Sequence, residues 1–244
     1  MDFSSIITKE NYNCMCYTNR DLIKGEIKGV ATQFHGYCGT DYRRSPKRFD
    51  EILAENGIVT LYPFYGPFAW SNDTAIKTID RLIQLTYEIN NISPENTPLV
   101  ITGASMGGMT ALAYTYYSAF NPIACAVDCP VTNLKKIIEM RKDIYRAMVT
   151  AFGHYNCTMD EAMASVSPIE LAPKMPKIPY YLIAGTNDCE VEYTEHCMKY
   201  VPRMRELGFD IEFKLVDGME HCCMSEANED IFCNFIIKNI EENR

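Results

Sequence analysis

Short apolar runs alternate with longer helical segments along most of this 244-residue chain. The runs are bounded by glycine, proline or polar residues, as buried strands are. They cover 26–34, 58–62, 99–102, 122–127, 180–184 and 209–216. Between them, apolar residues recur at helical spacing, as Ile76, Ile79 and Ile83 do. This alternation predicts one α/β domain over 1–244, with a doubly wound, mostly parallel sheet. A further strand is expected at 13–17, joined to 26–34 by the polar turn 18–21.

The stretch 98–113 joins a buried strand directly to a helix-forming segment. Its first part is β-branched, and the residues from Met106 onward are rich in Ala, Leu and Met. Ser105 lies at the junction and has glycines at positions 103, 107 and 108. A tight strand-to-helix turn needs glycines there, because a Cβ would clash as the backbone doubles back. We therefore predict a nucleophile elbow that exposes Ser105.

A serine hydroxyl becomes a good nucleophile only when a base takes its proton. The tetrahedral intermediate also needs N–H donors for its oxyanion. The helix that opens after Ser105 aims the backbone N–H of Met106, and the positive end of the helix dipole, at that position. Met106 is therefore one expected oxyanion donor.

The base can be sought among only four histidines. His35 precedes the serine, His196 falls inside a predicted helix, and His154 lies in a helical insertion. His221 alone follows the last strand, in the glycine-turned loop 217–223. We predict that His221 takes the proton of Ser105.

Three carboxylates compete for the role of orienting this histidine. Asp188 lies on the turn 185–191, at the carboxyl end of a strand, and is the preferred candidate. Asp128 ends the strand that follows the elbow helix, and Glu190 lies two residues beyond Asp188. Both remain alternatives.

Charge and apolar content exclude several classes of partner. The formal net charge is −9, and no lysine- or arginine-rich block stands out, so we expect neither nucleic acid nor a membrane as partner. The N-terminus has an early acid and no long apolar core, unlike a signal peptide, and no run has the length of a membrane span. These features predict a cytoplasmic protein.

Eleven cysteines are scattered along the chain without a C-x-x-C pair. We expect reduced thiols that serve mostly as small packing residues. The pairs Cys14/Cys16 and Cys222/Cys223 are too closely spaced for ordinary zinc ligands, so we expect neither metal nor cofactor. Three thiols lie near proposed active-site groups, and we interpret them as ordinary packing residues, with sensitivity of the protein to oxidation as the alternative; they are Cys38, Cys189 and Cys222.

Four motifs together resemble the α/β-hydrolase superfamily: 103–108 (Gly-Ala-Ser-Met-Gly-Gly), His35-Gly36, Ser167-Pro168 and 185–188 (Gly-Thr-Asn-Asp). The order serine, acid, histidine is also that of these hydrolases. The resemblance covers nearly the whole chain and is greatest to prolyl-oligopeptidase-type catalytic domains and to compact bacterial acyl and carbohydrate esterases. The sequence has no counterpart of the oligopeptidases' N-terminal propeller and departs from the His-Gly-Gly-Gly pattern of lipases. The first departure makes a peptidase an alternative rather than the preferred interpretation, and the second argues against a triacylglycerol lipase.

The resemblance also implies where the substrate binds. The loop after the second strand would supply the second oxyanion donor, from the backbone N–H of Tyr37 or alternatively of Cys38, with His35 ordering the loop. The rigid loop 63–70 leaves a strand at the ligand-binding edge. Its rings are expected either to wall the substrate pocket or to pack on the domain's own core; they are Phe64, Tyr65, Phe68 and Trp70.

Residues 131–174 interrupt the alternation with helical segments at 133–150 and 158–165 and no clear strand. We interpret this insertion as a small helical lid over the active site. The resemblance then implies a serine carboxylesterase that acts on small acyl esters through an acyl-enzyme. The alternatives are an acyltransferase or a small peptidase with the same triad, and a degenerate hydrolase fold that only binds ligands. The sequence leaves the oligomeric state open.

Overall fold

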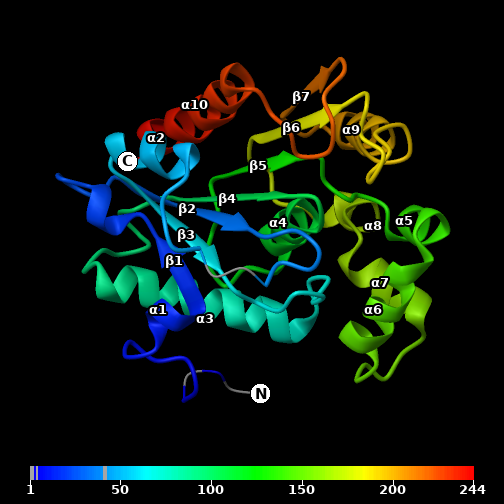
Figure 1. Ribbon diagram of the computed structural model, residues 1–244, viewed down its shortest axis with the longest axis horizontal. Coiled ribbons are helices and arrows are strands. Elements are labelled where there is room, and N and C mark those ends of the chain that lie inside the picture. The colour runs from blue at the N-terminus through cyan, green and yellow to red at the C-terminus, as the bar shows by residue number, and fades with distance from the viewer. Residues whose placement is uncertain (1–2, 4, 41–42) are drawn as a thin grey trace.

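A computed structural model describes residues 3, 5–40 and 43–244. Its centre is a seven-stranded sheet in the order β1-β3-β2-β4-β5-β6-β7 (Figure 1). All neighbouring strands are parallel except β1 and β3, which pair antiparallel. The strands are β1 (Cys16–Thr18), β2 (Gly29–Phe34), β3 (Ile58–Pro63), β4 (Leu99–Ala104), β5 (Ala124–Asp128), β6 (Tyr180–Gly185) and β7 (Ile211–Val216). The doubly wound, mostly parallel sheet expected from the sequence is confirmed.

Ten α-helices and two short 3-10 helices lie within the described residues. The helices are α1 (Tyr12–Met15), α2 (Arg48–Glu55), α3 (Asp73–Ile89), α4 (Met106–Tyr117), α5 (Leu134–Met140), α6 (Lys142–Phe152), α7 (Met159–Val166), α8 (Pro168–Leu171), α9 (Cys197–Glu206) and α10 (Glu226–Glu242). The 3-10 helices are η1 (Arg20–Leu22) and η2 (Ala172–Lys174). None of the described helices is long and apolar enough to cross a membrane.

The two faces of the sheet support two separate cores. Alternate residues of a strand point to opposite faces, so Leu99 and Ile101 join the larger core while Val100 joins the smaller one. Residues of α3, α4 and α9 complete the larger core, and residues of α2 and α10 complete the smaller one. Figure 1 shows α2 and α10 on one side of the sheet and α3 on the other. The strands β2 to β6 are therefore buried on both faces, which explains their nearly continuous apolar sequences.

The N-terminal region differs from its prediction. Most of the strand expected at 13–17 is the helix α1, and β1 begins only at its end. β1 does not pair with β2, because β3 lies between them. The buried Asn19 side chain explains this placement: it accepts the N–H of Thr60 and donates to the carbonyl of Ile58. These bonds attach the turn after β1 to β3.

The segment 131–174 forms four helices and η2 where two helical segments were expected. The long predicted helix breaks at Arg141, whose backbone is extended (φ −127°, ψ 91°). Two contacts join this segment to the start of α3: Asn72 Nδ2 donates to the carbonyl of Ala151, and the hydroxyl of Tyr155 accepts the N–H of Asp73. In Figure 1, α5 to α8 lie together on the side toward which the arrows of β2 and β5 point.

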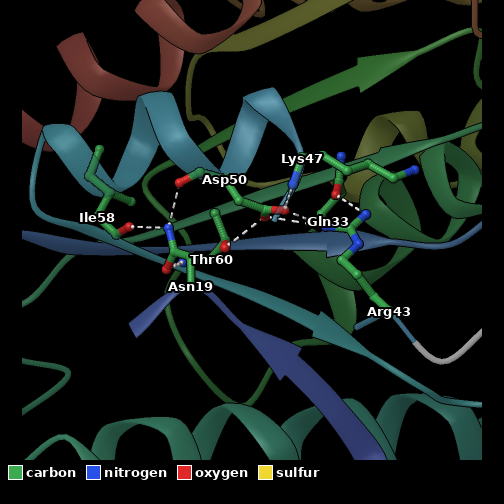
Figure 2. A network of polar contacts seen from close by, with 7 residues as sticks. All are labelled: Asn19, Gln33, Arg43, Lys47, Asp50, Ile58 and Thr60. Carbon is green, nitrogen blue, oxygen red and sulfur yellow. Dashed lines mark hydrogen bonds and ion pairs between the residues drawn. The ribbon is translucent and has the colours of Figure 1, made fainter. Parts of the chain in front are cut away.

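A buried carboxylate, Asp50, fixes α2 against the sheet (Figure 2). It pairs with Arg43 at 3.1 Å and accepts the hydroxyl of Thr60 and the backbone N–H of Lys47. Arg43 in turn donates to the side-chain oxygen of Gln33. The Asp50 side chain has no exposed surface, so these bonds replace all of its hydration.

We expect Asp50→Ala to lower the free energy of unfolding by about 3 to 5 kcal/mol, because it leaves the Arg43 charge without its buried partner. The same substitution at the exposed neighbour, Glu51→Ala, should change stability by less than about 0.5 kcal/mol. Urea unfolding followed by circular dichroism measures both. Equal, small effects of the two substitutions would show that the Asp50 network contributes little.

A second buried polar contact holds the chain where it leaves β5. His196, which precedes α9 and is fully buried, accepts the N–H groups of Thr132 and Asn133 at its Nδ1. Burial lowers the pKa of His196 to about 4, although the charges of Asp188 and Glu192 oppose the shift. An Nδ1 that accepts two hydrogen bonds requires a neutral ring.

This burial predicts acid sensitivity with a definite sign. Between about pH 6.5 and 4 the unfolded chain binds a proton at His196 that the folded chain does not, so stability falls as the pH is lowered. An asparagine at position 196 cannot bind this proton. The stability difference between wild type and His196→Asn should shrink by about 3 kcal/mol from pH 7 to pH 4, measured by urea unfolding at each pH. Parallel pH curves for the two proteins would contradict this role.

Candidate active site

Ser105 lies between β4 and α4 in a strained backbone conformation, with φ 57° and ψ −123°. Its N–H donates to the carbonyl of Asp128 at 3.0 Å, and its carbonyl accepts the N–H groups of Met109 and Val131. Such backbone geometry costs about 1 to 3 kcal/mol and persists only where the surroundings fix it. Here the end of β5 and the first turn of α4 fix it from both sides.

The glycines around Ser105 are required by close backbone contacts. A Cβ on Gly107 would lie 2.1 Å from the carbonyl oxygen of Phe34, and one on Gly103 would lie 2.2 Å from that of Gly107. The first turn of α4 therefore packs directly on the end of β2 and on β4. A Cβ on Gly36 would lie 3.7 Å from the Cβ of Ser105, so the loop after β2 lies beside the serine.

The two alternatives for the second oxyanion donor differ in the structure. The N–H of Cys38 donates to the carbonyl of Pro67 at 3.0 Å and is not free for a ligand. Within the described part of the chain, no hydrogen bond engages the N–H of Tyr37 or of Met106. Tyr37 and Met106 therefore have the available amides, one on each side of Ser105.

Asp188 and His221 come together from the loops after β6 and β7. Nδ1 of His221 lies 2.7 Å from Oδ2 of Asp188, and the other carboxylate oxygen accepts the N–H groups of Glu190 and Val191. A Cβ on Gly185 would lie only 1.9 Å from the carbonyl oxygen of Met219, so the two loops pack backbone to backbone. Both carboxylate oxygens of Asp188 are satisfied, and the histidine ring is oriented.

The pKa values of this pair shift in the directions that an ion pair requires. Burial favours the neutral form of Asp188, but hydrogen bonds from His221 and from two backbone amides outweigh it and lower the pKa of Asp188. Burial alone would also lower the pKa of His221, whereas the hydrogen bond to Asp188 raises it above its ordinary value. The carboxylate thus stabilises the imidazolium form of His221.

The other two acids occupy different positions. Asp128 is buried at the end of β5, its Oδ1 has no hydrogen-bond partner among the described residues, and desolvation raises its pKa to about 6. Glu190 is exposed and pairs with Arg141. Neither is hydrogen-bonded to the His221 ring, and Asp188 alone of the three candidates has that contact.

Two thiols lie close to the His221 ring. A ring nitrogen of His221 and the Sγ atoms of Cys129 and Cys222 all lie within 4.8 Å of one another. The structure, over the residues it describes, has no hydrogen bond between the hydroxyl of Ser105 and His221. Cys129 follows Asp128, whose carbonyl binds the N–H of Ser105, so the ring and the serine lie on the same edge of the sheet.

The aromatic rings of the loop after β3 divide into two groups. Tyr65 and Trp70 are buried in the larger core, and the hydroxyl of Tyr65 donates to the carbonyl of His35. Phe64 and Phe68 are exposed. The ring of Phe68 lies 5.1 Å from that of Tyr37, whose amide is one of the two free donors.

Arg141 lies beside the candidate site, although no sequence pattern indicated it there. Its guanidinium lies 5.6 Å from the centre of the Tyr37 ring and pairs with Glu190, two residues beyond Asp188. Its neighbour Met140 lines a cavity of about 380 Å³ together with Asp188 and Tyr193. A single arginine inside a predicted helix gives no sequence signal, because only the helix break at this position brings it to the loops.

Solved structures with the same fold include both peptidases and esterases. The acylaminoacyl peptidase of Pyrococcus horikoshii matches with a TM-score of 0.72 and 14% identity, over 88% of this chain and 38% of its own. Esterase B from Lactobacillus rhamnosis matches at 0.68 and 14%, over 91% and 79%. An S-formylglutathione hydrolase from Agrobacterium tumefaciens matches at 0.69 and 14%, over 93% and 88%. The fold is therefore that of the α/β-hydrolases.

The chain spans about 40% of the length of the acylaminoacyl peptidases that it matches. A search of curated proteins finds no match. The model of the prolyl oligopeptidase family matches residues 77–238, which include the elbow and the loops that hold Asp188 and His221. The chain therefore belongs to the prolyl oligopeptidase family of serine hydrolases.

Proposed function

We propose that this protein is a serine carboxylesterase that hydrolyses small acyl esters through an acyl-enzyme, with Ser105, Asp188 and His221 as its triad. The observation that carries the proposal is the hydrogen bond between Nδ1 of His221 and Asp188, on the same edge of the sheet as a strained Ser105. This bond fixes the tautomer of the ring, so that Nε2 is free to accept a proton.

In this mechanism Nε2 of His221 approaches the hydroxyl of Ser105 when substrate binds. Contacts of this kind are often long in ligand-free sites and shorten in the complex. Ser105 attacks the ester carbonyl while His221 takes its proton, and the amides of Tyr37 and Met106 stabilise the oxyanion. His221 then protonates the leaving alcohol, and water hydrolyses the acyl-enzyme by the same steps in reverse order.

The surroundings of Tyr37 support a preference for small acyl groups. Its ring contacts Phe68 and the buried Trp70, and Arg141 lies on it from the helical segment. These large side chains leave little room beside the oxyanion donors. The contact of Arg141 with both Tyr37 and the acid loop also supports our proposal that 131–174 acts as a lid.

A second candidate function is a small peptidase that uses the same triad. The family match and the shared fold with acylaminoacyl peptidases favour it. The two functions differ in whether the site protonates an amine or an alcohol leaving group. We also propose a cytoplasmic location, because the eleven cysteines all carry free thiols and such thiols persist in a reducing compartment.

We expect Ser105→Ala to lower kcat for p-nitrophenyl acetate by about a millionfold, because no other group would form the acyl-enzyme. Ser118→Ala, the same change at the opposite end of α4, should leave kcat within about twofold. Activity in Ser105→Ala within tenfold of wild type would rule out the mechanism.

Stopped assays with acetyl, butyryl and octanoyl esters of p-nitrophenol should give kcat/KM at least about tenfold higher for acetyl than for octanoyl. Faster cleavage of acetyl-alanine p-nitroanilide than of the acetyl ester would favour the peptidase.

The choice among the three acids can be tested separately. Asp188→Asn should lower kcat by about 10⁴-fold, because His221 loses the partner that fixes its tautomer. Asp128→Asn and Glu190→Gln, which remove carboxylates without a hydrogen bond to His221, should retain kcat within about tenfold. The readout is kcat at saturating p-nitrophenyl acetate, with thermal melting as a check on folding. A greater loss in Asp128→Asn than in Asp188→Asn would assign the role to Asp128.

A further inference from the structure

We propose that Cys129, His221 and Cys222 form a binding site for a thiophilic divalent cation such as Zn²⁺, and that the bound cation inhibits the enzyme. The inhibition rests on the proposed role of His221, whereas the binding does not. The cation acts here as a regulator and is not a cofactor of the reaction.

The three donor atoms already lie close together. Sγ of Cys129, Sγ of Cys222 and a ring nitrogen of His221 are all within 4.8 Å of one another. In a tetrahedral zinc site with bonds of about 2.0 to 2.3 Å, the ligand atoms are separated by roughly 3.5 to 3.8 Å. The donors need to approach one another by about 1.3 Å at most. Thiolate and imidazole are the ligands that Zn²⁺ and Cd²⁺ prefer.

The backbone determines which ligands are fixed and which can move. Cys129 is buried, and its N–H donates to the carbonyl of Ile183 on the neighbouring strand β6. Cys222 is exposed, in a loop whose base is attached through the bond from the N–H of Asn187 to the carbonyl of Met219. A cation can therefore bind to a fixed thiol and draw the exposed Cys222 toward it, with solvent completing the tetrahedron.

The contact with Asp188 orients the His221 ring for a cation in the same way as for catalysis. Metal-binding histidines usually donate their second ring N–H to a carboxylate, which orients the ring. Nδ1 of His221 has this contact with Asp188, so Nε2 is the ring nitrogen left for a cation. The cation binds the thiolate forms of the two cysteines and the neutral form of the ring, so any protons that these three groups carry are released to solvent, and it occupies the lone pair of Nε2. That lone pair is the one needed to deprotonate Ser105.

We expected no metal because Cys14/Cys16 and Cys222/Cys223 are too closely spaced along the chain for zinc ligand pairs. The cluster instead uses one cysteine from the end of β5 and one from the loop after β7. Strand β6 lies between these two strands in the sheet, and the loops after β5 and β7 meet beyond its end.

Titration of the full-length, reduced, chelator-treated protein with Cd²⁺ tests the binding. One equivalent should produce thiolate-to-metal charge-transfer absorption in the ultraviolet, and Zn²⁺ should displace it. The absorption should persist in Ser105→Ala, so binding can be scored even if the esterase proposal fails. Cys222→Ser should weaken Cd²⁺ affinity at least about a hundredfold, and Cys129→Ser should do the same if it folds. The matched controls Cys189→Ser and Cys223→Ser should bind as wild type does.

Hydrolysis of p-nitrophenyl acetate tests the inhibition. One equivalent of Zn²⁺ should abolish at least nine-tenths of the wild-type activity, with full recovery on addition of EDTA, and Cys222→Ser should resist the same concentration. The proposal is overturned if Cd²⁺ gives no thiolate absorption, if Cys222→Ser binds it as tightly as wild type, or if Cys223→Ser removes the site instead.

Discussion

The strained backbone of Ser105 depends on one hydrogen bond, from its N–H to the carbonyl of Asp128 at the end of β5. Val131 donates back to the carbonyl of Ser105, so the chain leaving β5 contacts the elbow on both sides of the serine. The strain is tolerated because β4 and β5 pair in parallel up to Ala104 and Asp128. The register of these two strands therefore decides where the nucleophile points. It also places Cys129, the next residue of the chain, at the same edge of the sheet.

Much of this architecture could be predicted because its causes are local in the sequence. The buried strands are apolar runs, and the elbow needs glycines that stand out at positions 103, 107 and 108. Six parallel strands, from β2 to β7, overlap their predicted ranges closely. At the N-terminus the polar side chain of Asn19 decided the outcome: it bonds to β3, and the expected pairing of β1 with β2 does not form.

The sequence indicated candidate residues for the site, but not the distances between them. Loop composition and chain order indicated Asp188 and His221, and the structure places them 2.7 Å apart. The choice between Tyr37 and Cys38 required the structure, because it depends on which amide the carbonyl of Pro67 accepts. The same holds for Arg141 and Cys129. Their contacts depend on a helix break and on the order of the strands in the sheet, and neither leaves a motif.

Two carboxylates lie near one imidazole, and their environments separate their roles. Asp188 accepts two backbone N–H groups and the ring of His221, which stabilise its charge. Asp128 has an orphaned Oδ1, and desolvation raises its pKa to about 6, with the charge of Asp188 adding to the shift. Hydrogen-bond donors therefore keep Asp188 ionised more readily than Asp128, and Asp188 lies on the loop that orients the His221 ring. Asp188 is therefore the ionised neighbour at Nδ1 of His221. This contact leaves Nε2 as the ring nitrogen that can accept a proton from Ser105.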